Sequence, residues 1–331
     1  MYSFGKRTFE QKLDRRKEPE SRITLLCRET AYGISKDIAI LHGIFDRQNT
    51  RFVSMRSKGL SGLFRRPELE GLILHLERLQ PRGLTANHVN WVLPNQERFP
   101  PRHLHLLRHV DLVLAKSRHA EEIFSALKAP TFHLGFTSED RLDPRAGKAW
   151  NKFLHLAGGS TLKGTEDILT LWARHPEWPE LVLVQKSENA PKAVPSNVRL
   201  FNSFIADDQL KILQNNCGIH LCPSRAEGWG HYIVEGLSAG SVVVTTDAPP
   251  MNELMTPECG ILVPVHRSEP RHLGTNFYVD TGKLESTVQQ LIEMSDAEKA
   301  VIGGNARKRF ERIDAEFRVR AAIMKQMASA S

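Results

Sequence analysis

Two glutamates, Glu227 and Glu235, stand eight positions apart in a segment whose residue types could support chemistry on a substrate. An apolar run at 217–222 comes before this segment and favours a buried strand, and the residues after Gly230 favour a helix. One carboxylate would therefore lie in the turn and the other about one turn inside the helix. Gly228 and Gly230 keep such a turn thin, so that its backbone can approach a ligand closely.

A thin turn that leads into a helix presents free backbone N–H groups and the positive end of the helix dipole. Phosphate groups bind at such helix starts, and carboxylates bind hydroxyl groups. The segment therefore predicts a ligand that is both anionic and rich in hydroxyls, such as a nucleotide sugar. The alternative is that Glu227 and Glu235 are ordinary surface carboxylates. The two glycines, the aromatic residue between them and the strand expected at 241–246 favour the functional interpretation.

The composition is that of a soluble globular protein, with 331 residues of which 40% are hydrophobic and 25% charged. This length is sufficient for two domains with separate cores. No apolar run reaches the roughly 20 residues that a membrane-spanning helix needs, and the charged residues 1–22 do not resemble a secretion signal. The four cysteines are scattered without the spacing of zinc ligands, so we expect reduced thiols in the cytoplasm and no metal site.

The excess of positive charge belongs to the first half of the chain. Up to Pro144 there are 24 Lys and Arg residues against 17 Asp and Glu, which accounts for the whole net charge of +7. Residues 47–66 contain six basic residues, no acidic one and several apolar side chains. Such a segment could contact an anionic membrane peripherally, at its inner face, or face a phosphorylated acceptor. The alternative is a solvated loop on a basic domain.

Short apolar runs alternate with helical patterns along the chain, which indicates parallel βαβ units. In the first half we expect strands at 22–27, 72–76, 90–93, 111–115 and 131–134, and helices at 36–45 and 117–127. The polar, turn-rich stretch 135–148 is typical of a linker. The second series has expected strands at 153–157, 181–185, 198–201, 219–222, 241–246 and 261–265, and helices at 165–173, 207–214, after Gly230, at 284–294 and from 296. Ligands of open parallel sheets bind beyond the carboxyl ends of the strands, so polar residues there are site candidates.

Three consecutive segments resemble a known family: 227–235 (Glu-Gly-Trp-Gly-His-Tyr-Ile-Val-Glu), 236–244 (Gly-Leu-Ser-Ala-Gly-Ser-Val-Val-Val) and 245–253 (Thr-Thr-Asp-Ala-Pro-Pro-Met-Asn-Glu). The family is that of the retaining glycosyltransferases of the GT-B fold, family 4, also called group 1. The first segment is similar to its E-x7-E element, and Lys163-Gly164 after Gly158-Gly159 resembles its phosphate-contacting Lys-Gly turn. The resemblance covers roughly residues 150–265, and the first half resembles the family only as a βαβ series.

The resemblance implies an α/β protein with the GT-B fold, in which two Rossmann-like, doubly wound parallel-sheet domains face each other. The acceptor-side domain would span 1–144, the donor-binding domain 145–308, and a C-terminal helix at 309–331 would cross back to the first domain. It also implies retaining, metal-independent transfer of a sugar from a nucleoside diphosphate sugar to a hydroxyl. No Asp-x-Asp motif occurs, and no cofactor is expected beyond the donor substrate.

The resemblance also implies a role for individual residues. Glu235 would accept hydrogen bonds from ribose hydroxyls, a charge-assisted pair worth roughly 1.5–3 kcal/mol, and Glu227 would lie near the donor sugar. Lys163, Gly230 and His231 would face the diphosphate, where a cation and a helix start stabilise the departing group. Lys163 could instead be a solvated lysine, but the good helix start that follows it favours a ligand. The other residues expected around the donor are Gly158, Gly159, Ser160, Arg225, Gly228, Trp229 and Tyr232.

Two departures from the family pattern bear on the site. Ser160 stands where many members have an arginine, so Lys163 acts alone or another cation, such as Arg225, supplies the second charge. Family members often have a histidine close to the donor sugar after a middle strand of the first domain, and Asn95 and Glu97 occupy the comparable turn here. The candidate catalytic residues are therefore Glu227, Lys163, Asn95 and Glu97.

Further candidates follow other expected strands. Glu253 either caps its loop or holds sugar hydroxyls, and Phe204 and Ile205 are candidates for contact with the nucleotide base. Four residues after strands of the first half are candidates for the acceptor side, each with a structural role as the alternative: Tyr32, Gly33, His75 and Glu77.

The predicted function is a glycosyltransferase that acts on a saccharide or lipid-linked acceptor by front-side attack, with UDP or GDP as the expected nucleotide. One rival is another GT-B enzyme, such as a nucleotide-sugar epimerase or a phosphorylase. The other is a non-catalytic GT-B protein that binds saccharide or nucleotide. Nucleic acid is not an expected partner, because the second half of the chain carries no net charge.

Overall fold

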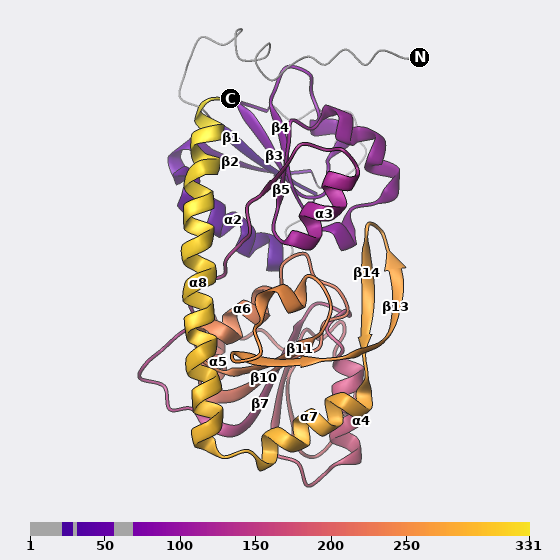
Figure 1. Ribbon diagram of the computed structural model, residues 1–331, viewed down its shortest axis with the longest axis vertical. Helices are drawn as coiled ribbons and strands as arrows, with labels where there is room; N and C mark the ends of the chain where they lie inside the picture. The colour runs from indigo at the N-terminus through magenta and orange to yellow at the C-terminus, as the bar shows by residue number, and fades with distance from the viewer. Residues whose placement is uncertain (1–21, 29–31, 56–68) are drawn as a thin grey trace.

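The computed structural model describes residues 22–28, 32–55 and 69–331, and Figure 1 shows their arrangement in two lobes. Each lobe contains a six-stranded sheet whose neighbouring strands all run parallel. Helices pack on these sheets, so the predicted architecture of two facing α/β domains is confirmed. The central strands are short apolar runs that are buried along their whole length, as expected for parallel sheets covered by helices.

The N-terminal lobe has the strand order β2-β1-β3-β4-β5-β6. Its strands are β1 (Ile23–Cys27), β2 (Thr50–Ser54), β3 (Leu72–Glu77), β4 (Asn90–Pro94), β5 (Leu112–Ala115) and β6 (Thr131–His133). Its α-helices are α2 (Tyr32–Phe45) and α3 (Arg118–Ala126), and its 3-10 helices are η1 (Arg47–Asn49), η3 (Pro81–Gly83), η4 (Gln96–Arg98) and η5 (Pro101–His109).

The basic segment 47–66 is in part a strand, which the sequence analysis did not predict. Its residues 50–54 form β2, which pairs with β1 at the edge of the sheet. Arg51 and Phe52 are exposed there, so the edge strand lacks the continuous apolar run that marks its neighbours. Residues 56–66, on which most of the predicted membrane contact falls, lie outside the described residues.

The C-terminal lobe has the strand order β12-β11-β10-β7-β8-β9. Its strands are β7 (Ala149–Gly158), β8 (Leu181–Gln185), β9 (Val198–Phe201), β10 (Cys217–Cys222), β11 (Val242–Thr246) and β12 (Gly260–Val263). Its helices are α4 (Thr165–Arg174), α5 (Asp207–Asn216), α6 (His231–Ser238), η6 (Met251–Leu254), α7 (Thr281–Glu293) and α8 (Asp296–Ser329).

A hairpin that the sequence analysis missed projects from the C-terminal lobe toward the N-terminal lobe (Figure 1). It consists of the antiparallel strands β13 (Val265–Arg271) and β14 (Gly274–Val279). Leu273 at its tip packs with an apolar cluster of the N-terminal lobe, and its backbone N–H donates to the carbonyl of Gln96 over 3.2 Å. The hairpin therefore connects the two lobes at η4.

Helix α8 extends along both lobes (Figure 1). It begins with the predicted capping box between Ser295 and Glu298 and continues through position 309 without a break. It contacts α6 and β11 in the C-terminal lobe and α2 in the N-terminal lobe. Near its end the Arg320 side chain donates to the carbonyl of Leu134 over 2.8 Å.

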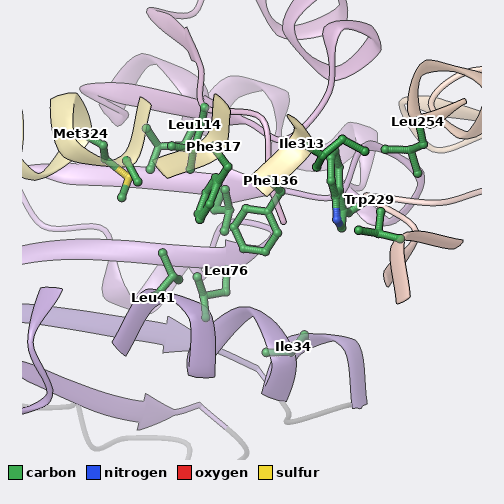
Figure 2. Packing of buried hydrophobic residues seen from close by; sticks show 14 of the residues in the cluster. Ile34, Leu41, Leu76, Leu114, Phe136, Trp229, Leu254, Ile313, Phe317 and Met324 are labelled. Carbon is green, nitrogen blue, oxygen red and sulfur yellow. The ribbon is translucent and has the colours of Figure 1, made fainter. Parts of the chain in front are cut away.

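One apolar core joins the two lobes (Figure 2). Phe136, in the linker between them, lies between Phe317 of α8 and Trp229 of the C-terminal lobe, with ring centroids 5.2 and 6.2 Å away. The same cluster contains Leu41 and Leu114 of the N-terminal lobe. The lobes are thus packed on each other through buried apolar side chains, so the loops at their facing sheet ends are held at short distance.

Candidate functional site

The carboxyl ends of the two sheets meet where β4 and β10 end. The Gln96 side chain of η4, after β4, donates to the carbonyl of Glu227 over 2.8 Å. Beside it, a Cβ placed on Gly228 would lie 2.2 Å from Cγ of Asn95, so only a glycine fits at this contact. The predicted turn after β10 and the predicted turn after β4 are therefore in direct contact across the lobes.

Lys163, on the loop before α4, forms an ion pair with Glu227, in the turn after β10. The Ser224 hydroxyl donates to the same Oε1 of Glu227 and lies 2.6 Å from the Tyr232 hydroxyl. Lys163 Nζ also lies 3.8 Å from the centre of the Tyr232 ring. Burial raises the pKa of Tyr232, so its hydroxyl stays protonated and can donate. We call these four residues the Lys163 cluster.

Lys163 is placed by the Gly-rich loop between β7 and α4. Gly158 and Gly164 both have positive φ, at 54° and 70°, and Gly164 is the residue before the first turn of α4. A Cβ on Gly164 would lie 2.5 Å from the carbonyl oxygen of Pro223, next to the Glu227 loop. Ser160 accepts the Leu162 N–H over 3.1 Å. These contacts hold the loop that carries Lys163 against the loop of Glu227.

His231 begins α6 directly after Gly230, whose φ is 106°. Its two ring nitrogens are engaged by residues outside the C-terminal lobe: Nε2 lies 3.0 Å from Asp37 Oδ1 and Nδ1 lies 2.9 Å from Ser138 Oγ. The His231 side chain is therefore a contact between lobes. Its backbone, at the helix start, is the part that a diphosphate could reach.

Asp37 of α2 and Lys116 after β5 form a buried ion pair beside His231. Each is 2% exposed, and Lys116 Nζ donates to Asp37 Oδ2 over 2.6 Å and to Asn95 Oδ1 over 3.0 Å. Burial alone would raise the pKa of Asp37, but the charge of Lys116 and the contact with His231 outweigh it and lower that pKa. Lys116 thus fixes the Asn95 side chain against Gly228.

Glu97 of η4 is buried, and its Oε2 has no hydrogen-bond partner. Burial raises the pKa of Glu97 to about 7, and the charge of Glu227 adds to this effect. Arg98, whose Nε lies 4.0 Å from Oε1, opposes it only weakly. Near neutral pH this carboxyl can therefore either release or accept a proton, which a group acting on an acceptor hydroxyl must do.

The pKa of Glu97 predicts how stability depends on pH. Because the folded-state pKa lies above the value of 4.5 for a glutamate in the unfolded chain, unfolding releases a proton between these two pH values, and stability falls as pH rises. We expect Glu97→Gln to match the wild type at pH 4 and to exceed it by about 2–3 kcal/mol at pH 8, as measured by urea unfolding. Glu177→Gln, an exposed carboxyl on the surface, is the control. If the difference in unfolding free energy between Glu97→Gln and the wild type is the same at pH 4 and pH 8, Glu97 does not ionise near neutral pH.

Glu235 lies one turn inside α6 and is 1% exposed. Its Oε2 accepts the Gln214 side-chain N–H over 2.9 Å, and its Oε1 lies 3.4 Å from Lys36 Nζ of the N-terminal lobe. Oε1 accepts no hydrogen bond within normal distance. Lys36 also pairs with Glu139 over 2.7 Å. One oxygen of Glu235 is thus buried beside Lys36 without a hydrogen-bond donor.

Glu253 caps a helix of the other lobe. Its carboxylate accepts the backbone N–H groups of Arg118 and His119, over 2.7 and 2.8 Å, at the start of α3. Arg309 of α8 holds the same loop by donating to the carbonyl of Glu253 over 2.8 Å. The structure therefore gives Glu253 a capping role, which was one of its two predicted alternatives, but across the lobes rather than within its own loop.

The acceptor-side candidates have different environments. His75 is buried, accepts the Gln80 N–H over 3.1 Å, and has its pKa lowered to about 4 by burial, so it is neutral and structural. Glu77 ends β3 with a φ of 66° and lies 3.3 Å from Arg78 and 3.4 Å from Arg98. Tyr32 and Gly33 open α2, and the Tyr32 side chain lies outside the described parts of the chain.

The remaining donor candidates lie at the edge of the C-terminal lobe. Arg225 pairs with Glu166 over 3.2 Å and Asp167 over 3.4 Å, so its charge is already compensated by α4. Phe204 is 93% exposed in the loop between β9 and α5, next to Ile205. A fully exposed aromatic ring there is accessible for stacking on a base.

Sequence reasoning missed Asp37, Lys116 and Gln96. Lys116 directly follows an apolar run that was predicted as a strand, so its position was a usable signal. Asp37 lies inside a helix whose apolar pattern gave no hint of a buried charge, and Gln96 lies between two residues that were selected. Their roles depend on contacts between lobes, which sequence patterns do not report.

The comparisons with known proteins agree with this geometry. Residues 185–274 match the family model described as "Glycosyl transferases group 1". The match covers this segment, less than half of the chain. It contains the Glu227 turn, α6 and the loop of Glu253, the same residues whose spacing carried the resemblance. No curated protein matches the sequence.

Solved structures show that the group 1 segment sits in a GT-B fold. Sucrose-phosphate synthase from Thermosynechococcus elongatus aligns over 94% of this chain and 100% of its own, with a TM-score of 0.67 and 14% identity. Anabaena HepE in complex with UDP and glucose aligns over 92% of this chain and 100% of its own, with a TM-score of 0.69 and 16% identity. A chain of the GtfA/B complex aligns over 78% of this chain, with a TM-score of 0.58 and 11% identity. The alignment covers only 58% of the GtfA/B chain, which is the longer of the two.

Two further searches concern membranes and metals. Among the helices that the described residues form, none has the length and apolar character to cross a bilayer. Within the same residues, no three or more His, Cys, Asp or Glu side chains are grouped so that they could hold a metal ion.

Proposed function

We propose that this group 1 glycosyl transferase moves a sugar from a nucleoside diphosphate to an acceptor hydroxyl, with retained anomeric configuration and without a bound metal. The observation that carries the proposal is the Lys163–Glu227 ion pair, set between the Gly-rich loop before α4 and the start of α6. It places a cation, a carboxylate and a helix start at the facing ends of two parallel sheets.

The diphosphate of the donor takes the place of Glu227 beside Lys163. Lys163 and the backbone at the start of α6 then stabilise the negative charge that grows on the diphosphate as the glycosidic bond to it breaks. Glu227, released from the lysine but still bonded to Ser224, is free to accept hydrogen bonds from the sugar. The electron pair of the broken bond leaves with the diphosphate.

The acceptor hydroxyl attacks from the side of the leaving diphosphate, which accounts for retention. Its proton passes to an oxygen of the departing diphosphate. Asn95, held by Lys116 against Gly228, lies at the sugar, and Glu97 lies on the acceptor side of the same turn. The Glu97 carboxyl can orient the acceptor hydroxyl through a hydrogen bond while the proton passes to the diphosphate.

Ribose hydroxyls of the nucleotide reach the free oxygen of Glu235 beside Lys36, and the base lies toward Phe204 and Ile205. UDP and GDP are the nucleotides we favour. UDP is also the nucleotide bound in the Anabaena HepE structure. We also propose that the enzyme is cytoplasmic. Its acceptor is a saccharide or a lipid-linked saccharide, and the basic segment 47–66 brings the enzyme to this acceptor near the membrane surface.

A thermal-shift panel of UDP, GDP, ADP and dTDP tests the donor site. Because a ligand that binds only the folded state stabilises it by mass action, one nucleotide at about 100 times its Kd should add about 2.7 kcal/mol and raise Tm by a few degrees. Lys163→Met should lose most of this shift, whereas Lys152→Met on β7, which lies outside the Lys163 cluster and is 40% exposed, should keep it. The absence of a shift with every nucleotide would contradict the proposed donor.

A further inference from the structure

Four arginines from both lobes lie close enough to His272, at the tip of the β13–β14 hairpin, for their charges to act on it. Burial lowers the pKa of His272 at this tip, and the positive charges of Arg271, Arg78, Arg102 and Arg98 lower it further. Each of these arginines comes from a different part of the fold: β13, the end of β3, η5 and η4. We call the four arginines the arginine cluster.

The arginine cluster carries more positive charge than its neighbours compensate. Glu77 lies 3.3 Å from Arg78 and 3.4 Å from Arg98. Among the described residues, no carboxylate lies within ion-pair distance of Arg102 or Arg271. The Nε atoms of Arg78 and Arg271 are both buried and have no hydrogen-bond partner. A buried guanidinium N–H without an acceptor is costly, so these groups point to a missing anion.

The arginine cluster borders the candidate site at η4, the 3-10 helix that carries Arg98. Gln96 donates to the carbonyl of Glu227 on the donor side and accepts the Leu273 N–H of the hairpin. A Cβ on Gly274 would lie 3.2 Å from the backbone of Glu97. A group bound by the arginine cluster therefore lies beside Glu97, on the side of the acceptor.

We propose that the arginine cluster binds a phosphate group carried by the acceptor. This inference rests on the proposed function, since it names the chemical class of the acceptor. Planar guanidinium groups donate pairs of hydrogen bonds that match phosphate oxygens, and the two unpartnered Nε–H groups need such acceptors. A phosphorylated sugar and the phosphodiester of a lipid carrier share this chemistry.

Calorimetric titration with inorganic phosphate tests the site. We expect Arg102→Gln/Arg271→Gln to bind phosphate about tenfold more weakly than the wild type, because two charge-assisted contacts are lost. Arg145→Gln, which removes one positive charge from an exposed linker residue, should bind like the wild type. Circular dichroism shows whether each variant is folded.

The donor site could also hold phosphate, so the same titration is made with Lys163→Met. Phosphate binding that survives this change but not Arg102→Gln/Arg271→Gln supports the proposal. Binding that depends on Lys163 alone, or wild-type protein that does not bind phosphate, overturns it. Displacement by glucose 6-phosphate indicates a soluble acceptor, and displacement by vesicles that contain phosphatidic acid indicates a lipid-linked one.

The two proposals fail in different experiments. If no nucleotide shifts Tm while phosphate binding still depends on Arg102 and Arg271, the donor proposal fails and the arginine cluster stands as a phosphate site. If a nucleotide binds but Arg102→Gln/Arg271→Gln has the same phosphate affinity as the wild type, only the inference about the acceptor fails. With a phosphorylated acceptor, Arg102→Gln/Arg271→Gln should raise the acceptor KM about tenfold and leave the donor KM unchanged.

Discussion

Glu227→Gln should lower the turnover of sugar transfer by about 10²–10³-fold, because it removes a charge from the reacting centre. In the structure this carboxylate is bonded to Ser224 and paired with Lys163, so glutamine keeps its shape and loses only its charge. Nucleotide affinity should stay the same or rise, since the diphosphate no longer has to replace a charged carboxylate as the partner of Lys163. Steady-state kinetics and nucleotide titration measure the two effects separately.

Glu166→Gln is the matched control for this experiment. Glu166 is an exposed carboxylate on α4 that pairs with Arg225, and its loss removes the same charge outside the Lys163 cluster. It should change turnover by no more than about twofold, as expected for an exposed ion pair. Unchanged turnover in Glu227→Gln would remove Glu227 from the mechanism and favour a protein that binds saccharide or nucleotide without catalysis.

Lys116→Met should destabilise the protein by about 3–5 kcal/mol, because it leaves the buried charge of Asp37 with His231 as its one remaining partner among the contacts described above. Lys116 also holds Asn95, so the variant loosens the contact between Asn95 and Gly228. Asp37→Asn combined with Lys116→Met should recover part of the loss, since no isolated charge remains. Urea unfolding of the two single variants and the double variant measures the coupling.

The pH dependence gives this prediction a second readout. The folded-state pKa of Asp37 is lowered, so its stabilising contribution is present above the pKa of the unfolded carboxyl and is lost as the pH falls through the folded value. Lys116→Met should therefore cost most near neutral pH and less in acid. A loss below about 1 kcal/mol at neutral pH would mean that this pair contributes no more than an exposed one.

The central strands of both sheets could be predicted because burial on both faces demands an unbroken apolar run. The runs at 23–27 and 217–222 are examples, and both are fully buried strands. The edge strand β2 and the β13–β14 hairpin could not be predicted in this way. Their residues are mostly exposed or partly buried without a regular alternation, and the hairpin carries charged residues up to its tip.

Some residues of the candidate site could be predicted from the sequence, and others could not. Glu227 and Lys163 were found because a turn of thin backbone before a helix imposes glycines at fixed positions, which the sequence shows directly. The partners of these residues in the other lobe were not found. The approach of Asn95 to Gly228, and the capping of α3 by Glu253, depend on how two separately folded sheets are placed against each other.

The apolar core that passes through Phe136 and α8 is shared by the two lobes, in addition to the separate clusters on each lobe. Domain interfaces within one chain are ordinarily polar enough for the parts to separate, but here separation would expose Phe317 and Trp229 to water. A fragment that ends in the linker would carry this apolar face uncovered and tend to aggregate. Separating the two lobes would therefore expose more apolar surface to water than separation at a polar interface would.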